Sequence, residues 1–453
     1  MHSPLLLLLA LPVSLPGFAA GQSGTPSEWP GFLGPSGDNS YRGAELETNW
    51  GPNGPPVAWT ADVGPGFGGV AVSGGEVFLV DRIRGEADLV RCLSFEDGSQ
   101  RWELAYEALG RLSYAGSRAA PTVTGEHVYT TGPMGPVHCI DRETGEVLWS
   151  IDQAELFNQE RPYFGWCQAP LVVGDLLILA PLGTEVGLAA VERSTGETVW
   201  TTPTVGQGHS SPTLIELNGR AQVLMVSAMV TDEERSRGQL PEESLVSART
   251  GRGGLISSFD PRTGRRLWHS FAPACTSPVA PALRVDDSRV FVTGGYLAGS
   301  VLLEITQDGG EYSVSEVFRH RLGSSVHPAV RWGDHLFLTT TENFNEPRSR
   351  WDEAGLMCLG LDGEERWRTG ADPNFGRGSV LVAKGVLVTL DGHDGVLRLI
   401  EATGDGYHVL AEAAVFPEER RREARMWAPM ALADGRLLLR SEERLKCLDL
   451  RRD

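Results

Sequence analysis

A short cassette that ends in an acidic residue, a Thr-Gly turn and a tryptophan recurs along this chain about every 45 to 50 residues. The clearest copies occupy residues 139–149 (CIDRETGEVLW), 190–200 (AVERSTGETVW) and 258–268 (SFDPRTGRRLW). A small residue followed by proline, and then a run of Val, Ile and Leu, precedes each copy. A fixed period of this length with four short strands per unit is typical of a β-propeller blade. The sequence therefore predicts an all-β propeller built from four-stranded antiparallel blades.

The number of blades follows from the tryptophans that end the cassette. They fall at Trp59, Trp102, Trp149, Trp200, Trp268 and Trp367. The interval between the last two is twice the usual one, so we expect a degenerate blade that ends near Phe318. A second degenerate copy has its turn at Thr403 and Gly404, and the final copy stops at residues 447–450 without a tryptophan strand.

The outer strand that the final copy lacks has a counterpart near the N-terminus. Residues 57–59 read as an outer strand with no preceding blade of their own. We expect them to complete the last blade, because closing the ring removes exposed sheet edges. The sequence thus predicts an eight-bladed propeller closed by an N-terminal strand, or a seven-bladed one if a degenerate copy is not a blade.

The repeated residues are expected to be structural. Each tryptophan can wedge between neighbouring blades and bury its ring against the next turn, and the acidic residue can cap backbone amides of that turn. Four cysteines share one position in the repeat: Cys92, Cys139, Cys358 and Cys447. Equivalent positions on different blades lie too far apart for disulfides, so we expect small buried side chains there.

Three segments are predicted along the chain: a signal peptide at residues 1–20, a lead-in segment at 21–49 and the propeller at 50–453. The apolar run at residues 4–13, followed by small residues, is typical of a secretory signal. No later segment is long and apolar enough to insert into a membrane. A formal net charge of −19 disfavours a nucleic-acid-binding surface. We therefore expect a periplasmic or secreted protein that binds no nucleic acid.

The connections between blades are the candidate binding surface. In a propeller they ring the mouth of the central channel, and we expect the long insertions at residues 229–253 and 341–355 on the same face. Seven side chains are predicted to form a ligand-binding set at this mouth: Arg118, Trp166, Gln168, His209, His327, Arg377 and Trp427.

Other side chains accompany this set in the sequence. Tyr114 and Tyr163 lie nearby, and Cys167 and Cys275 are expected as free thiols at the same rim. Arginine, aromatic and amide groups that converge on a cavity suit a small polar or anionic ligand, a sugar or a peptide segment. The alternative is a set of ordinary polar connections filled by water. The two histidines of the set have no evident third ligand, so no metal site is predicted.

The cassette, written A-x-D-x-x-T-G-x-x-x-W, resembles the repeat of the PQQ-like (pyrroloquinoline quinone) β-propeller superfamily over about residues 50–453. Residues 29–35 (WPGFLGP) resemble the lead-in of exported bacterial members. The superfamily includes quinoprotein dehydrogenases, outer-membrane assembly propellers and members without an assigned role. The resemblance therefore implies the fold and leaves the activity open between these classes.

A quinone-dependent dehydrogenase would, by this resemblance, carry two adjacent cysteines beneath the quinone and a calcium site. The chain has no such cysteine pair, and residues 342–346 and 391–395 are more simply turns than ligands for a hard cation. The glycine loop at residues 64–69 fits G-x-G-x-x-G by its letters, but a dinucleotide site needs a strand, turn and helix in a parallel unit. No catalytic residue and no cofactor are therefore predicted.

The favoured function is a non-catalytic exported propeller that binds an unidentified protein, peptide or small polar ligand at the channel mouth. The alternative is a PQQ-dependent oxidoreductase, similar to alcohol or sugar dehydrogenases, with a divergent site for PQQ and calcium.

Overall fold

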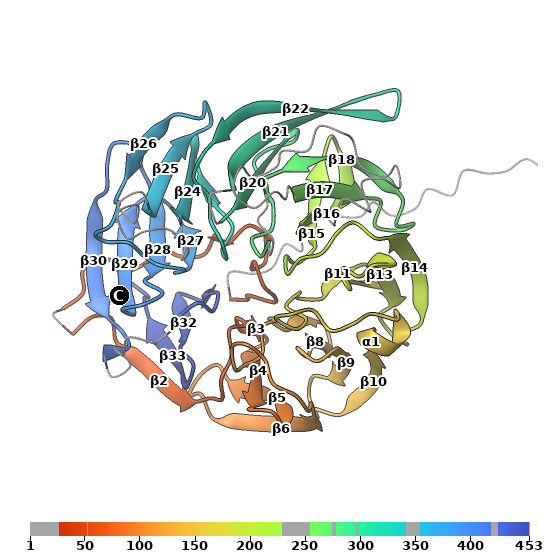
Figure 1. The fold of residues 1–453 in the computed structure, drawn as a ribbon. Helices are drawn as coiled ribbons and strands as arrows, with labels where there is room; N and C mark the ends of the chain where they lie inside the picture. Colours follow the sequence, from red (N-terminus) through yellow and green to blue (C-terminus); the bar gives the residue numbers. More distant parts are fainter. Residues whose placement is uncertain are drawn as a thin grey trace, which may run out of the picture.

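The chain forms a ring of eight β-sheets around a central channel (Figure 1). The structure is a computed structural model that describes residues 27–51, 53–228, 254–273, 278–295, 298–340, 354–417 and 425–452. Within these residues each sheet has four antiparallel strands, and one sheet carries a fifth strand from the lead-in segment. The predicted all-β class and eight blades are confirmed, and the seven-bladed alternative is wrong.

Blades 1 to 8 follow the chain, and each runs from its innermost strand outward. Blade 1 contains β3 (Ala71–Ser73), β4 (Glu76–Ile83), β5 (Ala87–Ser94) and β6 (Gln100–Glu107), and blade 2 contains β7 (Thr122–Thr124), β8 (His127–Thr131), β9 (Pro136–Asp141) and β10 (Val147–Asp152). Blade 3 contains β11 (Leu171–Val173), β12 (Leu176–Leu179), β13 (Val186–Glu192) and β14 (Thr198–Pro203), and blade 4 contains β15 (Thr213–Leu217), β16 (Arg220–Ala228), β17 (Gly254–Phe259) and β18 (Arg266–Ala272). Blade 5 contains β19 (Leu283–Arg284), β20 (Arg289–Gly294), β21 (Gly299–Asp308) and β22 (Glu311–His320), and blade 6 contains β23 (Val330–Trp332), β24 (His335–Thr340), β25 (Gly355–Gly360) and β26 (Glu365–Arg368). Blade 7 contains β27 (Val380–Ala383), β28 (Val386–Leu390), β29 (Val396–Glu401) and β30 (Val409–Ala414), and blade 8 contains β31 (Ala431–Ala433), β32 (Arg436–Arg440), β33 (Arg444–Asp449) and β2 (Val57–Asp62).

Blade 8 is built from both ends of the propeller. Its three inner strands come from the C-terminal part of the chain, and its outer strand is β2. β2 pairs antiparallel with β33, and Trp59 lies opposite Cys447. The predicted closure by an N-terminal strand is confirmed.

The cassette tryptophans join each blade to the next. The indole of Trp200 packs over Gly264 of blade 4, where an added Cβ would lie 2.5 Å from the ring, and its N–H donates to the Pro261 carbonyl at 3.2 Å. Four others donate in the same way to backbone carbonyls of the following blade, at 2.8–3.0 Å: Trp59, Trp102, Trp149 and Trp367. Trp268 instead donates to Oε1 of Gln222 at 2.8 Å, since blade 5 has no Thr-Gly turn to receive it.

The acidic residue of the cassette closes the turn on which the tryptophan packs. Oδ1 of Asp141 accepts hydrogen bonds from the backbone N–H groups of Glu143 and Thr144, at 3.1 and 2.8 Å. In degenerate blade 5, Phe318 takes the place of the tryptophan and packs over Gly363 of the next turn. The same inter-blade contact is thus made with a smaller ring.

The lead-in segment crosses one end of the channel (Figure 1). Trp29 and Val72 of β3 exchange two backbone hydrogen bonds of 2.8 Å, and the Pro30 carbonyl accepts from the N–H of Val123 at 2.8 Å. Further along, β1 (Ser40–Tyr41) pairs in parallel with β27. The segment therefore runs from blades 1 and 2 to blade 7, and it covers the channel where the innermost strands end.

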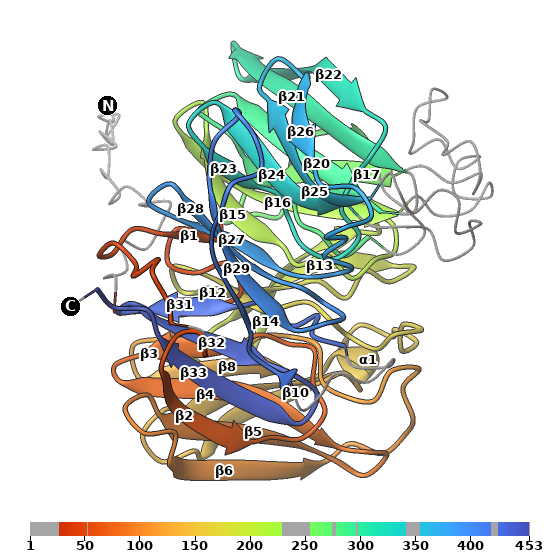
Figure 2. The same ribbon diagram turned by 90° about the vertical axis from the view of Figure 1, so that its left-hand side faces the viewer.

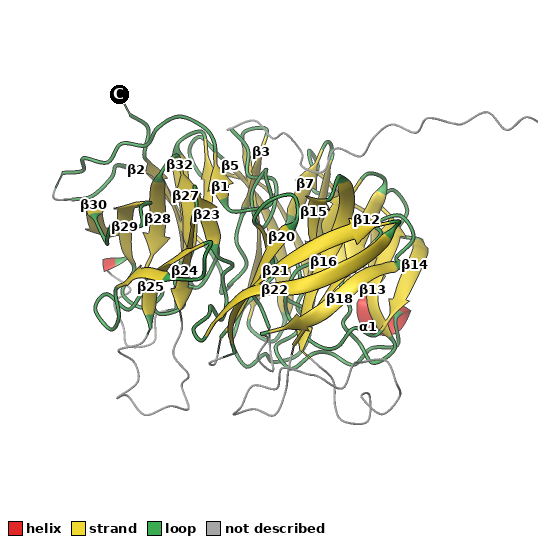
Figure 3. Cartoon of the chain, turned by 90° about the horizontal axis from the view of Figure 1, so that it is seen from above, coloured by secondary structure: helices red, strands yellow, loops and turns green. Residues whose placement is uncertain are grey.

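The two faces of the ring differ. β1 and the C-terminus lie on one face, and α1 (Gln153–Leu156), which belongs to the connection between blades 2 and 3, lies on the other (Figure 2 and Figure 3). In the part of the chain that the structure describes, no helix is long and apolar enough to cross a membrane. The predicted signal peptide, the insertion at 229–253 and residues 341–353 of the second insertion lie outside the described residues.

Candidate functional site at the channel mouth

A cavity of about 160 Å³ lies at the mouth of the channel, on the face of the inter-blade connections. Every blade contributes to its wall a side chain that lies three or four residues before the innermost strand. These eight side chains, called the mouth ring below, are Phe67, Arg118, Cys167, His209, Val279, His327, Arg377 and Trp427. Because the blades repeat around one axis, equivalent residues reach the channel at a similar height.

Five of the seven predicted ligand-binding side chains belong to the mouth ring: Arg118, His209, His327, Arg377 and Trp427. The structure does not bring Trp166 and Gln168 to the cavity, because successive side chains of an extended segment point to opposite sides. Cys167, between them, lines the cavity instead. Trp166 is fully buried away from it, and Nε2 of Gln168 donates to the Gly208 carbonyl at 3.0 Å.

The remaining predicted rim residues divide in the same way. Tyr114 lines the cavity, whereas the side chain of Tyr163 is 78% exposed and does not. Cys167 is a free thiol, and burial raises its pKa to about 12, so it stays neutral. Cys275 lies outside the described residues.

Aromatic rings form a continuous wall around part of the mouth. Phe67 lies 5.8 Å from Trp427 and 6.1 Å from Tyr114, measured between ring centroids. Tyr114 stacks on Phe164 at 6.1 Å, and Phe164 meets the edge of His209 at 5.3 Å. The connections of blades 8, 1, 2, 3 and 4 thus present one flat-sided apolar surface.

The charged groups of the lining are arginines. Nη1 and Nη2 of Arg118 donate to the carbonyls of Gly116 and Tyr114, at 2.6 and 2.8 Å. The guanidinium of Arg377 lies 4.8 Å from the ring centroid of Trp427, within the range of a cation–π contact. Among the described residues that line the cavity there is no Asp or Glu. The lining is therefore positive within a strongly acidic chain.

The two histidines of the mouth ring add no charge at neutral pH. Burial, and to a smaller extent the charge of Arg118, lowers the pKa of His209 to about 4. Burial also lowers the pKa of His327 to about 4, although hydrogen bonds to the backbone of Arg377 and Trp427 oppose this. Both imidazoles are neutral at pH 7 and act as hydrogen-bonding groups.

Several buried polar atoms of the lining have no hydrogen-bond partner among the described residues. They are Nδ1 of His209, Nε2 of His327 and Nε1 of Trp427. A buried polar group left without a partner costs about 1–3 kcal/mol. A ligand with hydrogen-bonding groups could satisfy these atoms.

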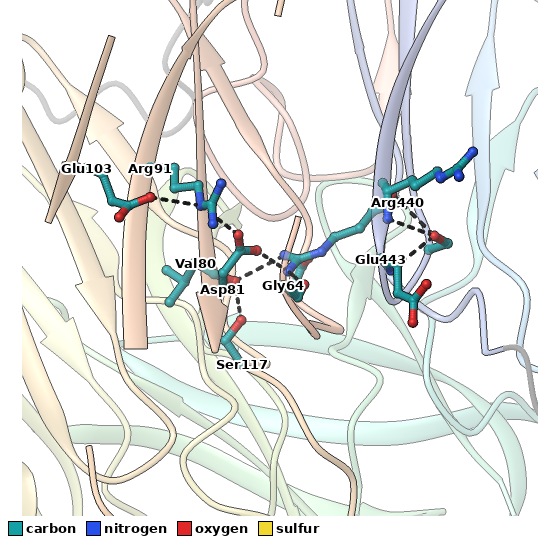
Figure 4. A network of polar contacts seen from close by, with 11 residues as sticks. Gly64, Val80, Asp81, Arg91, Glu103, Ser117, Arg440 and Glu443 are labelled. Carbon is teal, nitrogen blue, oxygen red and sulfur yellow. Dashed lines mark hydrogen bonds and ion pairs between the residues drawn. The ribbon is translucent and has the colours of Figure 1, made fainter. Parts of the chain in front are cut away.

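A buried ion pair holds the glycine loop that carries Phe67 (Figure 4). Nη2 of Arg440 in β32 lies 2.6 Å from Oδ1 of Asp81 in β4, so the pair joins blade 8 to blade 1. The same guanidinium donates to the carbonyls of Gly64 and Gly68, at 3.1 and 3.2 Å. The loop leads into a strand and supports the mouth ring, and it lacks the helix of a dinucleotide site.

The lead-in segment forms the floor of the cavity. Phe32 lines it from below, and also lines a second cavity of about 150 Å³ on the other side. Only Ala169 and Ser211 share this position with Phe32 between the two cavities. The channel is therefore divided in depth by one aromatic side chain and its neighbours.

Sequence reasoning missed Phe32, Phe67 and Phe164. Phe67 carried a usable signal, since it lies four residues before the innermost strand of its blade, as Trp427 does. Phe32 carried none, because nothing in the lead-in sequence indicates that it enters the channel. Phe164 lies three residues before the ring position, where the connection has no repeat pattern.

The side chains at the mouth also show whether a metal ion could be held there. Within the described residues no group of three or more His, Cys, Asp or Glu side chains is placed to hold one. A hard cation needs several converging oxygen ligands, and the described lining of the cavity supplies no carboxylate. The residues present do not fit a quinone held together with calcium.

Comparison with known proteins places this geometry among the propellers. A family model described as outer membrane protein assembly factor BamB matches residues 52–154, 89–252 and 252–443. No curated protein matches the sequence.

Solved structures share the fold at low sequence identity. BamB from Moraxella catarrhalis is 14% identical with a TM-score of 0.57, and covers 88% of this chain and 98% of its own. A europium-containing methanol dehydrogenase is 13% identical with a TM-score of 0.65, over 92% and 90% of the two chains. Quinohemoprotein alcohol dehydrogenase from Comamonas testosteroni is 12% identical with a TM-score of 0.61, over 95% and 81%. These likenesses show the fold alone.

Proposed function

The chain belongs to the family of PQQ-like β-propellers described by outer membrane protein assembly factor BamB, and we propose that it is a non-catalytic binding propeller. Its working surface is the cavity at the channel mouth, which takes a small ligand or a segment of a protein. We also propose that it acts in the periplasm or outside the cell, as the apolar run at residues 4–13 and the family match support.

One observation carries this proposal: the mouth ring is chemically varied at a position where the fold repeats. Structural positions of the cassette hold the same residue type in most blades, as the tryptophans and turn glycines do. The ring position instead holds Phe, Arg, Cys, His, Val, His, Arg and Trp. An asymmetric surface with unpartnered polar atoms and an aromatic wall supports specific recognition rather than scaffolding.

The alternative is a quinone-dependent alcohol or sugar dehydrogenase, which the likeness to methanol dehydrogenase favours at the level of the fold. The residues argue against it. The described lining of the cavity has no carboxylate for calcium or for proton abstraction, and no two cysteines are adjacent in the sequence. The binding function therefore accounts better for the residues at the mouth.

A variant of the mouth ring tests the binding function. Immobilised wild type and the triple variant Arg118→Gln, Arg377→Gln, Trp427→Phe are compared for the molecules that they retain from envelope extract. Trp332→Ala is the matched control, because Trp332 is 42% exposed at the far end of β23, on the opposite face. We expect the triple variant to lose the retained molecules and the control to keep them. Unchanged retention by a folded triple variant would contradict the proposal.

Addition of PQQ with calcium tests the alternative. A ligand at 100 times its dissociation constant stabilises a protein by about 2.7 kcal/mol, which shifts the melting temperature measurably. We expect no shift and no dye-linked oxidation of alcohols or sugars. A clear shift would favour the dehydrogenase.

A further inference from the structure

The cavity at the channel mouth is rich in hydrogen-bond donors. The guanidinium of Arg118 has five N–H donors, and among the described residues it donates to the carbonyls of Gly116 and Tyr114. Arg118 forms no ion pair with any residue that the structure describes. Nε1 of Trp427, which has no partner among the residues that the structure describes, can only donate. A ligand that supplies negatively charged acceptors would satisfy these groups.

The walls of the cavity require a flat apolar body. Aromatic rings line it on several sides: Phe32, Phe67, Tyr114, Phe164 and Trp427. Aromatic pairs gain more than their buried area alone, in stacked or edge-to-face geometry. An aliphatic acid would leave these ring faces poorly matched, and a neutral sugar would leave the charge of Arg118 without a counter-charge.

The volume of the cavity suits a ligand with one ring. Its volume of about 160 Å³ is close to that of an apolar cavity of about 150 Å³ that holds benzene. Phe32 closes the floor and separates a second space of about 150 Å³. A fused multi-ring ligand would have to displace this side chain.

We propose that the cavity binds a single-ring aromatic carboxylate, with the carboxylate paired to Arg118 and the ring on the aromatic wall, and that Phe32 sets how deep it reaches. The identification rests on the proposed function, since it assigns the ligand of the same cavity. A one-ring ligand of this size also excludes PQQ, which has three fused rings, from the cavity of the wild-type protein.

Calorimetric titration with benzoate and with benzamide tests the charge. The two share size and shape, so the difference in affinity reports the carboxylate. We expect benzoate to bind at least about tenfold more tightly, and Arg118→Gln to remove that difference. Arg161→Gln is the matched control, because Arg161 is exposed on the same face and does not line the cavity. Equal binding of both probes, no binding of benzoate, or full benzoate affinity in a folded Arg118→Gln variant would overturn the proposal.

Titration with 2-naphthoate tests the floor. Wild type should bind it at least about tenfold more weakly than benzoate, and Phe32→Ala should reverse the order by joining the two cavities. Phe32→Leu serves if the alanine variant does not fold, and should give a smaller change in the same direction. Tighter binding of naphthoate or PQQ than of benzoate to wild type would overturn the size limit.

The two sets of experiments distinguish failure of the proposed ligand class from failure of the proposed binding function. If the triple mouth variant loses its envelope partners but no aryl acid binds wild type, the ligand class is wrong and the binding surface stands. If neither the partners nor benzoate depends on the mouth ring, both are wrong.

Discussion

His327 shows at the scale of one residue how the fold changes the chemistry of the mouth. Its side chain is 2% exposed, and burial lowers its pKa from the ordinary 6.5 to about 4. His209 and His138 are buried with pKa values lowered to about 4 for the same reason. A histidine with a lowered folded pKa contributes stability that is fully present above pH 6.5 and is lost as the pH falls towards 4.

The free energy of unfolding should therefore fall between pH 6.5 and pH 4. Each of these imidazoles accounts for up to about 1.4 kcal/mol per pH unit. Asp88 acts in the opposite sense, because burial raises its pKa to about 6, so its contribution is lost as the pH rises through 6. One carboxyl only partly offsets three imidazoles. Urea unfolding at pH 7.0, 5.5 and 4.5 measures the net loss.

A single variant isolates the part due to His327. His327→Gln should lose less stability than wild type between pH 7.0 and pH 4.5, because its side chain does not titrate. His408→Gln is the control, since His408 is exposed on the rim of blade 7. Identical losses in wild type and His327→Gln would show that this imidazole is not buried as the structure has it.

Part of the mouth ring could be predicted from the sequence. Proline and small residues marked the connections, and five of the predicted side chains line the cavity. Trp166 and Gln168 are large or polar, as binding residues often are, yet Cys167 between them lines the cavity. Which of three consecutive side chains points into the channel depends on how the following strand is oriented. The residue types in the connection do not determine that orientation.

At the scale of elements, the contact between a tryptophan and the glycine of the next turn is the joint between blades. Gly264 has φ = 67°, a conformation that favours glycine, and an added Cβ would meet Trp200 at 2.5 Å. Gly219 has a similar φ of 70°, but nothing lies within 4 Å of an added Cβ. A comparison of alanine substitutions at these two glycines therefore separates the cost of backbone strain from the cost of losing the contact with the tryptophan.

Gly264→Ala should therefore destabilise the protein more than Gly219→Ala. Both variants incur about 1–2 kcal/mol for a non-glycine residue in the left-handed region. Only the first also displaces the indole of Trp200, which adds about 1–3 kcal/mol of packing strain. Urea unfolding of the two variants and wild type measures the difference. Equal losses would contradict a tight joint at Trp200.

The blades were predictable from sequence because this joint repeats. Acid, turn and tryptophan recur in the strong copies. Spacing predicts the degenerate blade whose outer strand contains Phe318, and a Thr-Gly turn at residues 403–404 predicts the one whose outer strand is β30. The partner of Trp268 could not be predicted, because the rule needs a Thr-Gly turn in the next blade, and β21 and β22 instead meet at Gly309 and Gly310. The repeat therefore predicts the contact between two blades only where both blades retain the repeated residues.

At the scale of the whole molecule, the ring is held shut between blades 8 and 1. Arg440 and Asp81 are both buried, and 359 positions separate them along the chain. Removal of one member of a buried pair costs about 3–5 kcal/mol where it leaves the other charge uncompensated. Asp81 also pairs with Nε of Arg91 at 2.9 Å, so loss of Arg440 leaves its charge partly compensated.

Arg440→Met should lower the free energy of unfolding by less than that amount, because Arg91 still pairs with Asp81. Arg440→Met with Asp81→Leu should recover part of the loss, since Arg91 keeps Glu103 at 3.3 Å. The recovery is partial because the carbonyls of Gly64 and Gly68 also lose their donor. Thermal and urea unfolding of both variants measure the two changes. A single variant as stable as wild type would show that this pair does not hold the ring closed.

The closure was predictable and the course of the lead-in was not. Residues 57–59 had the pattern of a missing strand, so counting strands placed them. β1 has two residues and joins β27 about 340 positions away, with no pattern of its own. The division of the channel by Phe32 follows from that contact, so it could only be seen in the folded chain.

The central claim is that this propeller binds through the mouth ring. The most direct measurement places the photo-crosslinking residue p-benzoylphenylalanine at Phe67 in one protein and at Trp332, on the opposite face, in another. Each is irradiated in envelope extract and the adducts are identified by mass spectrometry. We predict adducts from position 67 and none of them from position 332. Adducts that form only from position 332, or equally from both, would contradict the claim.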